Sequence, residues 1–275
     1  MEREIREEQL ELIRKKNVRK QEVELTERDL RILEFVLEMK FSNAESIFQK
    51  FFKITFSGLE ATSLGWTRKR LLQLERAGFL KTTYAFSEGT RYYLATRKAY
   101  EALSFYFPQS SFCYPLAQID HRTFAHDKFI LEYRVELEKR NSNCFWVSER
   151  MLKANPEFAF GLEGRYAPDA TYMLSQREMV AFELEISLKA KSRYREKVRK
   201  YVYAIRNSKT SSIPLSKVHF VVLTDSVEKI LKAETRIYPD YFQIERISSL
   251  DVPSKPSWLR TKSPKLVGER IVGAS

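Results

Sequence analysis

The sequence has little cysteine and no long hydrophobic run. Its 275 residues include only 2 cysteines, Cys113 and Cys144, too few for a disulfide-rich scaffold or a cysteine zinc cluster. No stretch of about 18 apolar residues is present, which excludes a transmembrane helix. The charged segment from Met1 to Lys20 has no apolar core of the kind that a signal peptide needs. These absences favour a cytoplasmic protein.

The chain is basic, and it has enough apolar residues to form a core. It carries 48 Lys and Arg against 36 Asp and Glu, a net charge of +12, and 43% hydrophobic residues. At roughly 100–200 residues per domain, its length predicts one or two domains. The excess positive charge points to an anionic partner, and double-stranded DNA is the leading candidate.

The positive charge is concentrated in two segments. Residues 61–100 carry eight bases and two acids, and residues 189–200 carry seven bases and one acid. Either segment alone could be a solvated helix face. Two such segments, each beside a recognisable motif, favour contacts with phosphate groups.

The N-terminal third has the pattern of three helices, a hairpin and a closing helix. Capping signatures at Thr26 and Ser42 begin the first two helices, and apolar residues at helical spacing continue them. The third helix is expected over Thr67–Ala77, with Gly78 as its stop. Two extended runs between residues 79 and 95 predict the hairpin.

This order, together with the passage from Arg70 to Lys81, resembles a winged-helix DNA-binding domain, which we place at residues 25–105. The first turn of the third helix is cationic and can enter the major groove, where Arg and Lys reach guanine edges. Bases of the hairpin can touch the neighbouring DNA backbone. A winged helix used for protein contacts is the alternative. The candidate DNA-binding residues here are Arg68, Lys69, Arg70, Lys81 and Arg91.

Three further segments are set apart by their composition. A charged arm, residues 1–24, precedes the winged-helix domain, and a proline-containing linker, residues 106–118, follows it. A basic tail, residues 251–275, ends the chain. We expect the tail to be flexible and able to follow DNA or bind a partner, and the arm to be flexible or a partner-binding helix.

Residues 119–250 predict an α/β domain with the order αβββαβ. The third strand holds two glutamates, Glu183 and Glu185, among apolar residues, and alternation places both on one face. Asp169 enters the second strand, fourteen positions before Glu183, which is enough for one strand to turn back. A long basic helix over Lys189–Arg206 follows the glutamates. The pattern therefore predicts three carboxylates brought together beside a basic helix.

Carboxylate oxygens that converge are the ligands that Mg²⁺ or Mn²⁺ prefers, and such a metal activates water and stabilises a scissile phosphate. The order resembles the PD-(D/E)XK nuclease superfamily, with Pro168-Asp169 at the PD position and Glu183-Leu184-Glu185 at the (D/E)XK position. Glu185 stands where the motif has lysine. Lys189 or Lys191 could supply the missing base, or the domain could be an inactive DNA-binding relic. The plainer alternative is a pair of surface acids that face Lys or Arg on an edge strand.

The basic helix offers further candidates for DNA contact. Arg193, Lys197 and Lys200 share a predicted face and could hold the DNA backbone beside the acids. Tyr201 lies one turn after Lys197, and we expect it to pack in the core rather than act as a nucleophile.

The helix that opens this domain carries auxiliary candidates. His126, followed by Asp127, begins this helix, and the pair is either a helix cap or part of a metal shell. Glu132 and Glu136 on the same helix are candidate auxiliary acids.

A winged helix followed by a PD-(D/E)XK-like domain resembles the replication-relaxation family of plasmids and other mobile elements, and the related plasmid mobilisation relaxases of the restriction-nuclease type. The matching features span roughly residues 25–205, and their order carries the resemblance. The resemblance implies origin binding and metal-dependent nicking or relaxation of DNA, with partners among replication or mobilisation proteins. The alternatives are a non-catalytic origin-binding or replication initiation protein and a winged-helix transcriptional regulator. An oligomer is compatible with each.

Overall fold

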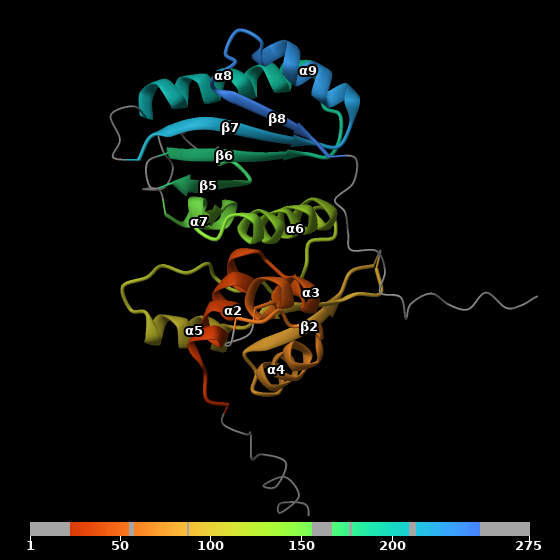
Figure 1. Ribbon diagram of the computed structural model, residues 1–275, viewed down its shortest axis with the longest axis vertical. Coiled ribbons are helices and arrows are strands. Elements are labelled where there is room, and N and C mark those ends of the chain that lie inside the picture. The colour runs from red at the N-terminus through yellow and green to blue at the C-terminus, as the bar shows by residue number, and fades with distance from the viewer. Residues whose placement is uncertain are drawn as a thin grey trace, which may run out of the picture.

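The computed structural model shows a mixed α/β chain, as predicted, with two sheets and helices around them (Figure 1). The predicted basic tail, residues 251–275, lies outside the described residues. Of the predicted arm, only residues 23 and 24 are described. No helix within the described part of the chain is long and apolar enough to cross a membrane. The structure describes residues 23–54, 58–86, 88–155, 167–175, 178–208 and 213–247.

The N-terminal unit has the predicted order of helices and hairpin. Its antiparallel sheet has the strand order β1-β3-β2. The short strand β1 is an addition, because Ser42 and Asn43 pair with Tyr93 and Tyr92 of the hairpin. The elements are α2 (Glu27–Glu38), β1 (Ser42–Asn43), α3 (Ala44–Ile47), the π-helix η1 (Phe48–Phe52), α4 (Gly65–Arg76), β2 (Leu80–Tyr84), β3 (Arg91–Ala95) and α5 (Arg97–Tyr106).

The helix ends of this unit follow from local chemistry. Thr26 and Asp29 form the predicted capping box of α2, in which each side chain accepts a hydrogen bond from the other residue's amide. Asn43 caps α3 by accepting a hydrogen bond from the Ser46 amide at 2.8 Å. Gly78 follows α4 with a φ of 82°, a left-handed conformation that glycine adopts without strain.

The C-terminal unit is a five-stranded mixed sheet with the order β4-β5-β6-β7-β8. The first three strands are antiparallel, whereas β7 runs parallel to β6 and β8 runs parallel to β7. The predicted order αβββαβ is present, and the short helix α7 is an addition after β4. The elements are α6 (Phe124–Arg140), β4 (Phe145–Ser148), α7 (Glu149–Ala154), β5 (Ala170–Ser175), β6 (Glu178–Glu185), α8 (Lys191–Asn207), β7 (Leu215–Val222), α9 (Asp225–Thr235) and β8 (Phe242–Arg246).

Helices cover both faces of this sheet. Helices α8 and α9 lie on one face and α6 lies on the other (Figure 1). Along β6, Phe182 and Leu184 belong to the core on the α6 side, and Ala181 belongs to the core on the α8 side. Glu183 and Glu185 share the alternation of Ala181, so both glutamates point toward α8.

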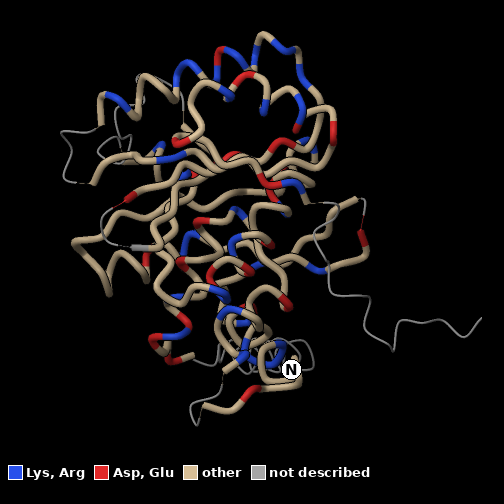
Figure 2. The backbone as a smooth tube through the Cα atoms, turned by 45° about the horizontal axis from the view of Figure 1, so that its top comes forward, with Lys and Arg blue, Asp and Glu red and all other residues tan. Residues whose placement is uncertain are grey.

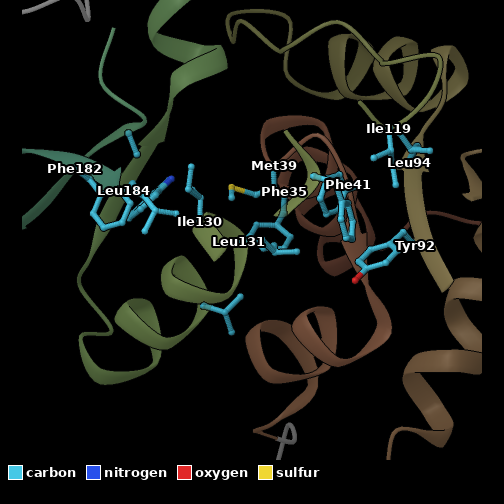
Figure 3. Close-up of a cluster of buried hydrophobic side chains, with 14 of the residues drawn as sticks. Phe35, Met39, Phe41, Tyr92, Leu94, Ile119, Ile130, Leu131, Phe182 and Leu184 are labelled. Carbon is cyan, nitrogen blue, oxygen red and sulfur yellow. The ribbon is translucent and has the colours of Figure 1, made fainter. Parts of the chain in front are cut away.

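The two units share one hydrophobic core. Phe35 and Met39 of α2 and its end belong to the same cluster as Leu131 of α6 and Phe182 of β6 (Figure 3). Helix α6 therefore lies between the sheet and the N-terminal unit. Leu131 and Val135 of α6 are buried because the helix is covered on two sides.

The predicted linker is a loop, but it does not separate independent bodies. Residues 107–118 form no helix or strand. Cys113 is buried in the N-terminal core, and Ile119, just after the loop, is buried in the shared core. The two units therefore pack against each other across this loop through one core.

A buried arginine also joins the units. Arg134 of α6 donates hydrogen bonds to Glu38 at 2.5 Å and to Glu138 at 3.0 Å. Its guanidinium lies 4.9 Å from the ring centre of Phe35. An arginine this deeply buried needs such partners, because an unpaired buried charge is costly.

Candidate functional site

Asp169, Glu183 and Glu185 come together where β5 begins and β6 ends. Ala170 pairs with Phe182 across the antiparallel strands, which places Asp169 opposite Glu183. The Asp169 carboxylate accepts a hydrogen bond from the Leu184 amide at 2.8 Å. The side chains of Glu183 and Glu185 are 4% and 0% exposed. The structure thus gathers the three predicted acids, and two of them are buried.

The ammonium of Lys197 lies between the two glutamates. Its Nζ donates to Glu183 Oε2 at 2.7 Å and to Glu185 Oε1 at 2.6 Å. We call Asp169, Glu183, Glu185 and Lys197 the acid cluster. Lys189 adds a second ammonium, 2.7 Å from Glu185 Oε2. A buried carboxylate pair requires such cations, because its desolvation is otherwise uncompensated.

Helix α8 positions the cation through its inner face. Tyr201, one turn after Lys197, is fully buried, as predicted, and its hydroxyl donates a hydrogen bond to Glu183 Oε1. Tyr194 is also buried, and its hydroxyl donates to the Ser187 carbonyl at 3.2 Å and accepts from the Lys189 amide at 3.1 Å. These bonds hold the connection between β6 and α8 beside the acids.

Electrostatics differ among the acids. Burial raises the pKa of Glu183; the Asp169 carboxylate adds to this rise and Lys197 opposes it. Burial also disfavours the charged form of Asp169, but the hydrogen bond and charge of His126 outweigh it and lower the pKa of Asp169. Burial opposes protonation of His126 as well, yet Asp127 and Asp169 raise its pKa to about 10. His126 is therefore an imidazolium at neutral pH.

His126 belongs to the surroundings of the acid cluster and not to a helix cap. The N-cap of α6 is Thr123, and no side chain there caps the helix. His126 Nε2 lies 3.3 Å from Asp169 Oδ2 and 3.3 Å from the Leu184 carbonyl oxygen. Asp127 is buried and accepts a hydrogen bond from the Thr123 hydroxyl at 2.8 Å. Of the two interpretations of the His-Asp pair, the cap is wrong.

The predicted auxiliary acid Glu136 is far from the cluster. It lies ten residues after His126, about 15 Å along α6 at 1.5 Å per residue. Its side chain is 45% exposed and pairs with Lys139 and Arg140. The prediction of a role for Glu136 in the site is wrong, because spacing along a helix cannot show which end of that helix meets the strands.

The three candidate bases of α8 differ in exposure and in partners. Lys197 enters the acid cluster, whereas Arg193 is exposed and Lys200 pairs with Glu196 on the outer surface at 2.8 Å. Lys191, a predicted source of the missing base, lies 3.6 Å from Glu234 of α9 instead. Figure 2 shows Lys and Arg along the α8 and α9 layer, mixed with Asp and Glu.

The predicted DNA-binding residues of the N-terminal unit also differ in exposure. Arg68 and Lys69 are exposed on α4. Arg70 instead donates to both carboxylate oxygens of Asp29, at 2.9 and 2.5 Å, and so holds α4 against the start of α2.

Two hairpin bases have partners within the fold. Lys81 donates to the Ala117 carbonyl at 2.6 Å, and Arg91 donates to Glu75 at 2.6 Å. The side chain of Arg91 is 42% exposed, so an anion can still reach it.

Sequence reasoning missed two residues. Trp66 lies in the first turn of α4, is 75% exposed, and has the Lys69 ammonium 5.4 Å from its ring centre. A signal existed, since a tryptophan stands just before the basic triplet of α4. Lys40, which follows α2, donates to Asp127 at 2.6 Å, and nothing in its local sequence marks it.

The glutamate pair suits a divalent cation in chemical type. Within the described ranges, no three His, Cys, Asp or Glu side chains form a ready metal site. The Lys197 ammonium nevertheless shows that one cation can contact Glu183 and Glu185 together. Hard carboxylate oxygens are the ligands of Mg²⁺. A metal would fit this pair when the ammonium moves aside.

A small cavity lies beside the cluster, between the units. Its volume is about 20 Å³, room for about one water molecule. The lining includes Lys40, Asp127, Glu149 and Asp169. A cavity of this size is too small to hold a nucleotide.

The geometry of the site must carry the functional argument by itself. No model of a known protein family, no curated protein and no solved structure matches this chain.

Proposed function

We propose that this protein is a site-specific DNA-binding protein of a plasmid or other mobile element that nicks or relaxes DNA with Mg²⁺ or Mn²⁺. In this proposal, the N-terminal unit is a winged helix and the C-terminal unit is a PD-(D/E)XK-like domain. The element orders support it. The small sheet has a short strand between the first two helices and a hairpin after the third. The large sheet has three antiparallel strands followed by two parallel ones.

One observation carries the proposal: the Lys197 ammonium contacts both glutamates of the acid cluster. A nuclease of this type needs carboxylates to hold a metal and a nearby cation to face the phosphate. Strand β6 has Glu185 at the position where the motif has lysine. Lys197 of α8 brings an ammonium to the carboxylate of this residue. The departure from the motif is therefore compensated by a residue twelve positions later.

The roles follow from the contacts. Glu183, Glu185 and Asp169 would hold the divalent ion, which supplies an activated water and stabilises charge on the phosphate. His126 holds Asp169, and its positive charge lowers the pKa of that carboxyl group. Lys197, moved aside by the ion, would remain a positive group near the acids and could face the phosphate.

DNA would first meet the exposed face of α4. Its exposed residues include Trp66, Arg68, Lys69, Leu72 and Arg76. The bases can contact phosphates or guanine edges, and the Trp66 ring offers an apolar surface. Arg193 on α8 provides a further exposed base near the acids.

The test is a nicking assay on supercoiled plasmid that carries the gene's own flanking DNA. The purified protein is incubated with Mg²⁺, Mn²⁺ or EDTA, alongside Glu185→Gln and Asp169→Asn. Glu136→Gln is the matched control, because Glu136 lies far from the cluster. We expect metal-dependent open circles from the wild type and the control, and none from the two cluster variants. Equal nicking by Glu185→Gln would refute the assignment.

One feature favours a second candidate, a non-catalytic DNA-binding protein. The acids of the cluster already have Lys197, Lys189 and His126 as positive partners without any metal. Such a network could be purely structural. Tight binding to the same DNA with no nicking under any divalent ion would establish this alternative.

A further inference from the structure

Lys40 connects the N-terminal unit to the acid cluster. It follows α2 and has a φ of 70°, and it is the one non-glycine residue with positive φ in the described part of the chain. Long side chains rarely adopt this conformation. Its Nζ donates to Asp127 Oδ1 at 2.6 Å and lies 3.8 Å from Glu149. The strained backbone thus directs an ammonium across the boundary between the units.

From Asp127 a series of contacts leads to the acid cluster. Asp127 is 6% exposed, and its Oδ1 lies 3.8 Å from His126 Nδ1. The other ring nitrogen of His126 lies 3.3 Å from Asp169 Oδ2. The order Lys40, Asp127, His126, Asp169 alternates between basic and acidic side chains, each within 3.8 Å of the next.

The two ends of α2 are both fixed. At the start, Asp29 accepts two hydrogen bonds from Arg70 of α4. At the end, Arg150 of α7 donates to the Leu37 carbonyl. The helix has 12 residues, which is about 18 Å at 1.5 Å per residue. It therefore spans from α4 to the neighbourhood of the acid cluster.

We infer that Lys40 is a positioning residue of the acid cluster: it holds Asp127, which orients His126, which in turn fixes Asp169. Its effect on cleavage rests on the proposed function, but the chain of contacts does not. The N-terminal unit then contributes more than DNA binding, because it supplies a side chain that sets the geometry of a site built on the other unit.

The first test reads His126 directly. Lys40→Met removes the ammonium and keeps most of the stem. Lys53→Met is the matched control, because Lys53 has similar exposure, 27% against 26%, and pairs with Glu60 inside the N-terminal unit. The chain has 3 histidines, so ¹⁵N spectra of the imidazoles are simple to assign with His121→Gln and His219→Gln.

We expect Lys40→Met to shift the ring nitrogen signals of His126 and to leave those of His121 and His219 in place. Lys53→Met should shift none of the three. Asp127→Asn provides a second variant at the other end of the contact, should Lys40→Met fail to fold. Unmoved His126 signals in a folded variant overturn the inference, whatever the protein does to DNA.

The second test separates positioning from binding. In the nicking assay, Lys40→Met should lower kcat by about 100-fold, the effect of a displacement of about 1 Å in a site, with KM for DNA nearly unchanged. If the wild type nicks DNA and Lys40→Met keeps its kcat, the inference is overturned. If His126 moves but the wild type nicks no DNA, the proposed function fails and the positioning contact stands.

Discussion

Replacing Lys197 with Met should unbalance the buried glutamates. The Lys197 side chain is 18% exposed and its partners are 4% and 0% exposed, so the pair is buried. Removing one partner of a buried ion pair costs about 3–5 kcal/mol. Lys189 still contacts Glu185 in the variant, so we expect the lower value, about 3 kcal/mol. At about 2–4 °C per kcal/mol for a domain of this size, Tm should fall by about 6–12 °C.

The assay is thermal unfolding with and without Mn²⁺. If a divalent ion replaces the ammonium, Mn²⁺ at 100 times its Kd should stabilise the variant by about 2.7 kcal/mol, close to the loss. In the wild type, the ion must first displace Lys197, so Mn²⁺ should raise the free energy of unfolding by less. Lys232→Met is the control: Lys232 pairs with Glu228 on the surface of α9, and such exposed pairs contribute about 0–1 kcal/mol.

Two results would refute this reasoning. A metal-free Lys197→Met protein as stable as the wild type would show that the ammonium does not balance the glutamates. An equal rise of Tm with Mn²⁺ in both proteins would show that the metal binds elsewhere. The second result would also count against the proposed metal site.

The remaining predictions concern the other charged contacts. Arg134→Met should lower the free energy of unfolding by about 3 kcal/mol in urea, the lower end for a broken buried pair, because Glu38 and Glu138 are partly buried and Glu138 keeps Lys50 as a partner; a loss below about 1 kcal/mol, typical of a surface pair, would contradict this. Burial opposes ionisation of Asp29, but hydrogen bonds from Arg70 and Thr26 outweigh it and hold its pKa below the ordinary 3.8. The carboxylate therefore stabilises the fold above that pH, and the stability gap between wild type and Asp29→Asn should shrink as pH falls below about 3.8; a gap that widens in acid would sink the argument. Arg68→Ala should weaken specific DNA binding by about 1–3 kcal/mol in fluorescence anisotropy without changing Tm, and unchanged binding would mean that α4 does not read the site.

Local chemistry predicted much of the fold. Capping at Thr26, the Gly78 stop and the alternation in β6 each act over a few residues, so the sequence alone reveals them. The gathering of Asp169 with Glu183 also followed, because two adjacent antiparallel strands leave little choice of register. Lys197 could have been placed as well, since it lies one turn before the buried Tyr201.

Long-range pairing explains what the sequence could not predict. Arg70 meets Asp29 from 41 positions away, and Lys40 meets Asp127 from 87 positions away. The spacing of apolar residues along a helix or strand does not show contacts between residues so far apart in the sequence. The same limit hid the second buried side of α6, because the N-terminal unit that covers it lies far back along the chain.

The shared core has a consequence for engineering and for the history of the molecule. Modules on flexible tethers can be exchanged between proteins, and each keeps its own stability. Here, such an exchange would expose to solvent the apolar residues of α6 that pack against the N-terminal unit. Under the proposed function, a new DNA specificity is therefore better sought by changing the exposed residues of α4 than by transplanting a foreign N-terminal unit. For the same reason, recombination within this lineage should tolerate changes on the outer helix face more readily than shuffling at the loop between the units.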